Sequence, residues 1–204
     1  LITTSIAEGF GLTFLEAGAI GKPLIGRDLP EITSDFQTRG HTPGTLYQQL
    51  LVPRSWVDEK RFRSLLKRSL HSLYNSYAEP LPPGILDDTY SALTYADHLD
   101  FGNLPEALQH DVLIRALANP RDLLVNTNQS SVPLPEWLPA ALQQHSSPEE
   151  NDNLEPWSVA HYATLHQELY RELLTTTPET PTWLEPRAVL AQFLKPERFH
   201  FLRS

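Results

Sequence analysis

The chain has 204 residues, of which 40% are apolar, so it can bury a sizeable core as one large domain or two small ones. A disordered tail and a collagen-like rod are therefore excluded. Its 16 Lys and Arg against 25 Asp and Glu give a net charge of −9, which argues against a protein whose main task is to coat nucleic acid or an anionic membrane. The absence of cysteine excludes disulfide frameworks, cysteine-ligated zinc and thiol nucleophiles.

The sequence also lacks methionine, an apolar run long enough to span a membrane and a targeting segment. The sequence contains no methionine and opens on a strand-like segment, which we interpret as an interior start within a longer protein. No apolar run reaches the roughly 18 to 20 residues of a membrane span, and no targeting segment is visible. Because the lack of cysteine also suits a reducing compartment, we expect a cytoplasmic protein.

The start of the chain alternates between short apolar runs and glycine-rich turns. Residues 1–4 are strand-like, residues 8–11 form a turn, and residues 12–20 carry apolar side chains at helical spacing. Gly21 then ends the helix, and residues 23–26 form a short apolar strand. This order predicts one crossover of a doubly wound parallel sheet.

Beyond this crossover, the sequence predicts helices between proline-rich loops, because its 18 prolines disfavour a regular βαβ repeat. Apolar residues at helical spacing predict helices at 58–74, 104–117, 157–174 and 188–194.

Asp58 is the expected N-cap of the first of these helices, whose basic face from Lys60 to Arg68 we expect to be solvated. Residues 42–53 are predicted to form a short helix or turn. Residues 86–101 are ambiguous. Residues 120–155 are polar and proline-rich, and residues 146–153 are their most linker-like part.

The turn before the first helix carries the residues with the clearest chemistry. A helix start exposes unpaired backbone N–H groups at the positive end of the helix dipole, and this favours a phosphate. Glu8 lies in the turn and Glu16 lies eight residues later, about two helical turns on, so both can face one crevice. Carboxylates beside a phosphate site are suited to accept hydrogen bonds from the hydroxyls of sugars and riboses.

The run from Glu8 to Leu12, followed by Glu16-Ala17 and by Gly21-Lys22-Pro23, resembles a known signature. It is similar to the carboxylate-x7-carboxylate motif of retaining glycosyltransferases with two Rossmann domains, the GT-B architecture. The resemblance covers roughly residues 3–26. It implies that Glu8 approaches the hydroxyls of the donor sugar as the catalytic carboxylate, and that Glu16 holds the ribose of the nucleotide.

The same resemblance implies a donor site along the turn. The main-chain amides around Gly11, Leu12 and Thr13 would meet the diphosphate, and Phe10 would shape the sugar pocket beside Gly9. The implied substrate is a nucleotide-diphospho-sugar, transferred with retention to an unknown acceptor that is a sugar, a lipid or a small metabolite. No metal or other cofactor is expected, and no nucleic acid partner.

In this family an N-terminal domain binds the acceptor, and an upstream Arg and Lys neutralise the diphosphate. We therefore expect that domain in a longer form of the chain. The expected fold is α/β: the C-terminal Rossmann-like half of a GT-B fold, followed by a mainly helical, proline-rich region. Residues 1–41 would end the nucleotide-sugar-binding domain, 42–150 would form a helical, proline-rich insertion or subdomain, and 151–204 would supply C-terminal helices.

Rival interpretations remain open at this point. In one, the Rossmann-derived turn is a non-catalytic scaffold within a protein-interaction module, an alternative that a buried salt bridge at Glu8 would favour. A sugar-nucleotide epimerase is less favoured, because its Gly-x-Gly-x-x-Gly turn is absent. A metal at Asp87-Asp88 or near Asp97 is also less favoured, because acidic loops usually face water.

Overall fold

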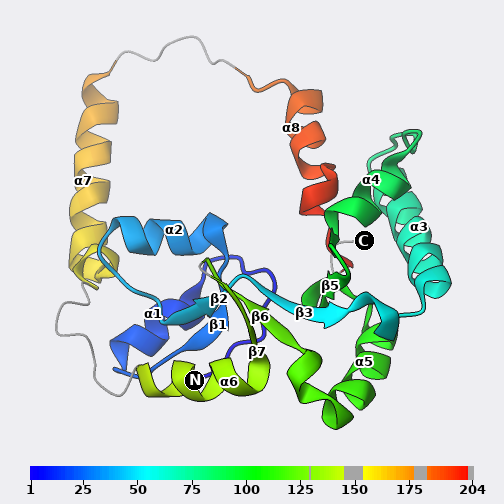
Figure 1. Cartoon of the computed structure of the whole chain (residues 1–204). Helices are drawn as coiled ribbons and strands as arrows, with labels where there is room; N and C mark the ends of the chain where they lie inside the picture. The colour runs from blue at the N-terminus through cyan, green and yellow to red at the C-terminus, as the bar shows by residue number, and fades with distance from the viewer. Residues whose placement is uncertain (129, 145–153, 177–182, 202–204) are drawn as a thin grey trace. The chain divides into compact units, whose positions relative to one another are not determined.

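The computed structural model describes residues 1–128, 130–144, 154–176 and 183–201 (Figure 1). The chain divides into two compact units. Unit 1 comprises Leu1–Gln48 and Leu138–Trp183, and unit 2 comprises Gln49–Trp137 and Leu184–Ser204.

The elements of unit 1 are α1 (Leu12–Ala19), β1 (Ile25–Arg27), α2 (Pro30–Thr38), β2 (Thr45–Tyr47) and α7 (Val159–Thr175). The elements of unit 2 are β3 (Gln49–Pro53), α3 (Glu59–Ser76), α4 (Ile85–Ala92), β4 (Thr94–Tyr95), β5 (His98–Asp100), α5 (Glu106–Ala118), β6 (Leu124–Asn126), β7 (Ser131–Pro133) and α8 (Pro186–Phe193). The chain passes from unit 2 into unit 1 within α6 (Leu134–Gln144).

Unit 1 contains the crossover predicted at the start of the chain. β1 and β2 pair in parallel, and Ile2 forms a further parallel bridge to Ile25. Gly21 has a φ of 60°, the left-handed conformation that ends helices, and the Lys22 N–H donates to the Ala17 carbonyl at 2.9 Å. The predicted helix and its end are confirmed, while the strand lies slightly later than residues 23–26.

Aromatic packing closes the core of unit 1. Phe14 of α1 and Phe36 of α2 are buried, with ring centroids 6.1 Å apart. Trp157, just before α7, contacts Phe36 at 5.3 Å and His41 at 5.8 Å between centroids. A residue more than 100 positions downstream therefore completes this core.

Unit 2 contains a sheet that the sequence did not predict. Five strands pair antiparallel in the order β4-β5-β3-β6-β7. The prediction of a helix or turn at 42–53 is wrong, because this segment forms β2 and β3. β6, β7 and α6 lie within the proline-rich stretch 120–155, where no strand or helix was predicted, and the linker-like residues 146–153 lie outside the described residues. The chain is mixed α/β, with a five-stranded antiparallel sheet and a two-stranded parallel sheet among the described residues.

The reason for the error is that β3 depends on distant partners. It pairs with β5 on one side and β6 on the other, and it buries Leu51 and Val52. A short apolar run of this kind is compatible with a buried strand or a helix segment, and its own periodicity does not distinguish them. The parallel pairing described in the structure is confined to β1, β2 and the Ile2 bridge, so a doubly wound sheet is not confirmed.

The predicted helices α1, α3, α5, α7 and α8 lie close to their expected ranges, whereas α2, α4 and α6 were not predicted. The Asp58 carboxylate caps α3 by accepting from the Arg61 N–H at 3.0 Å. One face of α3 buries Phe62, Leu66, Leu70 and Tyr74. α5, α7 and α8 each lie within a few residues of their predicted ranges. Near the end of the chain, Phe199 is buried in the same core as α3.

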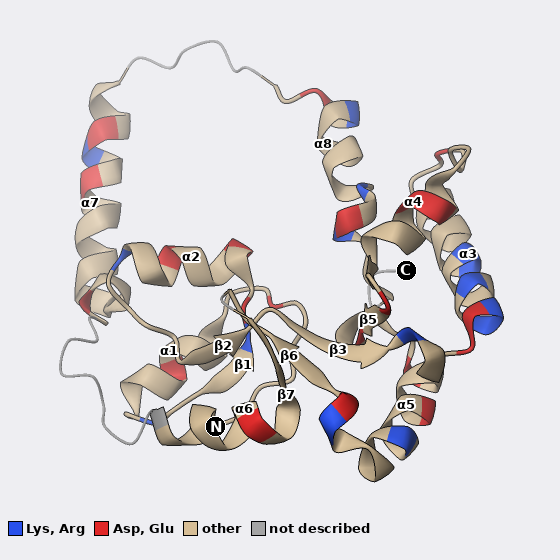
Figure 2. Ribbon diagram, in the orientation of Figure 1, with Lys and Arg blue, Asp and Glu red and all other residues tan. Residues whose placement is uncertain are grey.

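Figure 2 shows several ribbon segments of Lys and Arg, in blue, along α3. Across the described part of the chain, no helix has both the length and the apolar composition needed to cross a membrane.

Leu66 and Leu117 give a matched test of the core of unit 2. Leu66 is 0% exposed and Leu117 is 87% exposed. We expect Leu66→Ala to lower the free energy of unfolding by about 2–5 kcal/mol, because it leaves a cavity. Leu117→Ala should change it by less than about 0.5 kcal/mol. Urea unfolding followed by circular dichroism measures both, and equal losses would contradict the assigned core.

Candidate functional site

The structure places both candidate carboxylates of unit 1 at the turn and on the helix that follows it. Glu8 is half-buried in the turn, and Glu16 is on the exposed face of α1, whose other face buries Phe14 and Ala17. Neither carboxylate forms an ion pair or a hydrogen bond with another described residue. Both are therefore accessible to a ligand, and Glu8 forms no salt bridge with the described residues, the contact that would have favoured the scaffold alternative.

Gly11 is the most constrained position in this turn. It is buried with a φ of 67°, where most L-residues are strained. A β-carbon there would lie 2.4 Å from Ile32 Cγ2 of α2, and 3.2 Å from ring carbons of Phe14 and Phe36. By contrast, nothing lies within 4 Å of a β-carbon built on Gly9. Gly11 is thus required by packing against α2, whereas Gly9 leaves open space for a ligand.

The start of α1 has the properties of an anion site. Gly11 is its N-cap and offers no side-chain acceptor, and the Phe14 N–H donates to the Gly11 carbonyl at 3.0 Å. The N–H groups of Leu12 and Thr13 precede the first helical hydrogen bond and have no acceptor within the described residues. Phe10 stands beside them with 84% of its surface exposed.

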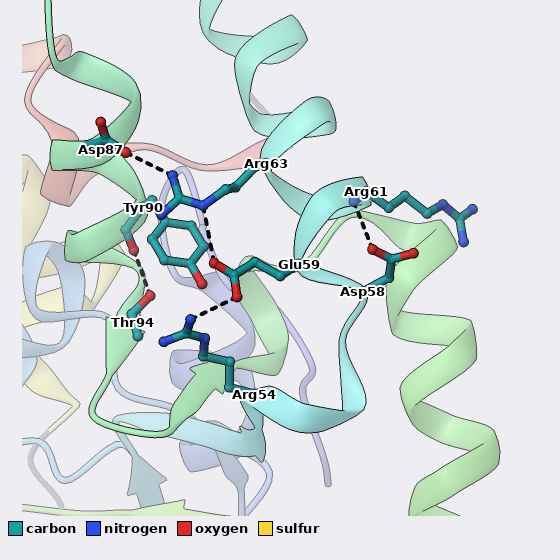
Figure 3. A network of polar contacts seen from close by, with 8 residues as sticks. All are labelled: Arg54, Asp58, Glu59, Arg61, Arg63, Asp87, Tyr90 and Thr94. Atoms are coloured by element: carbon teal, nitrogen blue, oxygen red, sulfur yellow. Dashed lines mark hydrogen bonds and ion pairs between the residues drawn. The ribbon is translucent and has the colours of Figure 1, made fainter.

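Unit 2 holds a polar cluster that sequence reasoning missed (Figure 3). Arg54 Nη2 donates to Glu59 Oε2 at 2.8 Å, Arg63 Nε donates to Glu59 Oε1 at 3.3 Å, and Arg63 Nη1 donates to Asp87 Oδ1 at 2.8 Å. The Arg63 guanidinium also lies 3.8 Å from the ring centroid of Tyr90. Arg63 therefore connects α3 to α4. The sequence analysis expected the basic face of α3 to be solvated, and this expectation does not hold for Arg63.

Neighbouring groups of opposite charge shift the pKa values of the residues in this cluster. Hydrogen bonds from Arg54 and then from Arg63 lower the pKa of Glu59. A hydrogen bond to Asp87 is the main reason that the pKa of Arg63 is raised. Burial raises the pKa of Tyr90, whose hydroxyl faces Glu59 without a hydrogen bond of good geometry (Figure 3). The cluster holds an ionised carboxylate and is unsuited to donate a proton at neutral pH.

No group of three or more His, Asp or Glu residues that could hold a metal ion occurs among the residues that the structure describes. Comparisons with protein-family models, curated proteins and solved structures find no match for this chain. Functional inference therefore depends on the residues and their geometry.

The two turn glycines provide a paired test of the packing at the site. Gly11→Ala combines a left-handed backbone with a clash against Ile32, so we expect it to destabilise unit 1 by about 2–4 kcal/mol. Gly9→Ala should change stability by less than about 1 kcal/mol, because its β-carbon meets open space. Thermal unfolding measures both variants, and equal shifts in Tm would contradict the contact with α2.

The Glu59 cluster predicts a specific pH dependence of stability. Because the pKa of Glu59 is lowered on folding, its stabilising contribution is full above the unfolded pKa of about 4.3 and is lost as the pH falls through the lower folded value. We expect the stability advantage of the wild type over Glu59→Gln to be constant above about pH 6 and to shrink below about pH 4.3.

Urea unfolding at several pH values measures this difference. Glu106→Gln is the control, because Glu106 is exposed and forms no ion pair with the described residues. An advantage over Glu59→Gln that stays constant down to pH 3 would contradict the role of the two guanidinium groups.

Proposed function

We propose that this chain supplies the donor side of a retaining glycosyltransferase that uses a nucleotide-diphospho-sugar. The observation that carries the proposal is the uninterrupted spacing from Glu8 to Glu16 across a glycine turn and the start of α1. Two carboxylates that have no partner among the described residues flank a helix start with open N–H groups. This combination suits a ligand that carries both phosphates and hydroxyls.

In this proposal, each part of the turn meets a different part of the donor. The N–H groups of Leu12 and Thr13 stabilise the negative charge that develops on the departing diphosphate, aided by the dipole of α1. Glu8 accepts hydrogen bonds from the sugar as positive charge builds at the anomeric carbon, and Glu16 accepts them from the ribose. Glu8 is not assigned a covalent role.

Several finer expectations belong to the same proposal. Phe10 and Gly9 border the sugar, because Phe10 is exposed and Gly9 adjoins open space. Transfer to an acceptor takes place in a longer chain that supplies the N-terminal domain and its basic residues, in the cytoplasm and without a metal ion. The acceptor is not assigned beyond a sugar, a lipid or a small metabolite.

A protein-interaction module is the second candidate function, favoured by α7. This helix has no buried residue. Its exposed large apolar side chains are Val159, Tyr162, Leu165, Leu169, Tyr170, Leu173 and Leu174. A module of this kind has no reason to bind a nucleotide sugar, so nucleotide binding discriminates between the two candidates.

The decisive measurement is saturation-transfer NMR of the full-length protein, which supplies the basic residues for the diphosphate, with UDP-, GDP- and ADP-sugars. We expect saturable binding of one nucleotide class, weakened roughly tenfold in Glu16→Ala, because hydrogen bonds between the ribose and a charged acceptor are lost. In a longer chain that carries the acceptor domain, Glu8→Ala should fold normally and lose most transfer activity.

Asp35→Ala is the matched control, since Asp35 is an exposed carboxylate on α2 outside the turn. Its nucleotide affinity should equal that of the wild type. An unchanged dissociation constant in Glu16→Ala contradicts the ribose assignment, and no binding of any of the three nucleotides contradicts the donor site itself.

A further inference from the structure

Unit 2 contains an open depression with a volume of about 560 Å³. It lies where the connection from β3 to α3 meets the turn between β4 and β5. Its lining residues are Pro53, Arg54, Ser55, Val57, Glu59, Asp97 and His98. This volume is within the range of small-molecule sites, and the lining brings polar groups from two separate stretches of chain together.

Main-chain contacts hold the two stretches in place. Pro53 is opposite His98 in the register of β3 and β5, and the Arg54 N–H donates to the Asp97 carbonyl at 2.8 Å. The Arg54 side chain is fixed in turn by its ion pair with Glu59 at 2.8 Å. The depression is therefore formed before any ligand arrives, which lowers the entropic cost of binding.

The turn that presents Asp97 has an unusual backbone. Ala96 has a φ of 53°, although alanine is strained in this region and glycine is not. Ala96 lies in the two-residue turn between Tyr95 and His98, which are paired in β4 and β5. As a result, Asp97 is held at the rim of the depression beside the Arg54 backbone.

The depression contains polar groups with unused bonding capacity. The Asp97 carboxylate, the His98 ring and the Ser55 hydroxyl form no hydrogen bond or ion pair with other side chains in the described part of the molecule. The guanidinium of Arg54 has five N–H donors and uses one of them in its hydrogen bond to Glu59. Both donors and acceptors are thus available to a ligand.

The charge balance selects the class of ligand. Arg54 faces the carboxylates of both Glu59 and Asp97, so the lining is slightly acidic and unfavourable for phosphate or carboxylate groups. Hydroxyl groups suit this lining, since each can donate to a carboxylate and accept from a guanidinium.

We propose that this depression binds a single neutral sugar ring, through hydroxyls that donate to Asp97 and accept from Arg54.

This sugar site goes beyond the proposed donor function, because it is formed by different residues in the other unit and does not require glycosyl transfer. Ser55 and His98 border the ring and supply further polar contacts.

The test is a titration of the ¹⁵N-labelled full chain with the methyl α-glycosides of glucose, mannose and galactose, followed by amide shifts. We expect at least one of them to give saturable shifts at Ser55, Asp97 and His98. Asp97→Ala and the isosteric Asp97→Asn should both weaken binding roughly tenfold, because the charged acceptor is lost. Asp122→Ala, at an exposed carboxylate outside the depression, should leave the affinity unchanged.

Several outcomes would overturn the proposal. They are the absence of saturable shifts with all three glycosides, an unchanged affinity in Asp97→Asn, and saturable shifts at the same amides with inorganic phosphate or zinc chloride instead. The unperturbed spectrum of each variant reports whether it is folded. A parallel titration with the nucleotide sugars reads nucleotide binding at the amides of Leu12, Thr13 and Glu16, so failure of the sugar site is distinguishable from failure of the donor site.

Discussion

The close packing of α2 against the Gly11 backbone is the contact on which the candidate donor site depends. Ile32 occupies the space that a side chain at position 11 would need, and Gly11 adopts a left-handed backbone that glycine tolerates without strain. This contact orients the start of α1 and leaves the Leu12 and Thr13 amides open. This contact also distinguishes Gly11 from Gly9, which looks equivalent in the sequence but has no atom within 4 Å of a β-carbon built on it.

Unit 2 is organised by its central strand β3 and by a series of ion pairs. β3 pairs on both sides, and its continuation through Arg54 carries the ion pairs with Glu59 that lead to Arg63 and α4. These pairs are partly exposed, so their contribution to stability is modest and depends on pH. Their structural effect is larger, because they fix the wall of the depression beside Asp97.

Helical elements were the most predictable part of this protein. A cap at Asp58 and apolar residues at helical spacing were sufficient to predict α3, because these signals are local. The strands of unit 2 were not predictable in this way. β3 is stabilised by Leu99 of β5 and Val125 of β6, which lie far along the chain, and no local pattern encodes that pairing.

The sequence by itself determined the spacing of Glu8 and Glu16, the glycine turn between strand and helix, and the end of α1 at Gly21. These features depend on residues within a few helical turns of one another. Only the tertiary structure decided that Gly11 packs under α2, that Arg63 turns toward Glu59 and Asp87, and that Arg54 and Asp97 share one depression. Each of those contacts joins segments separated in sequence, so its existence follows from chain topology rather than from local propensity.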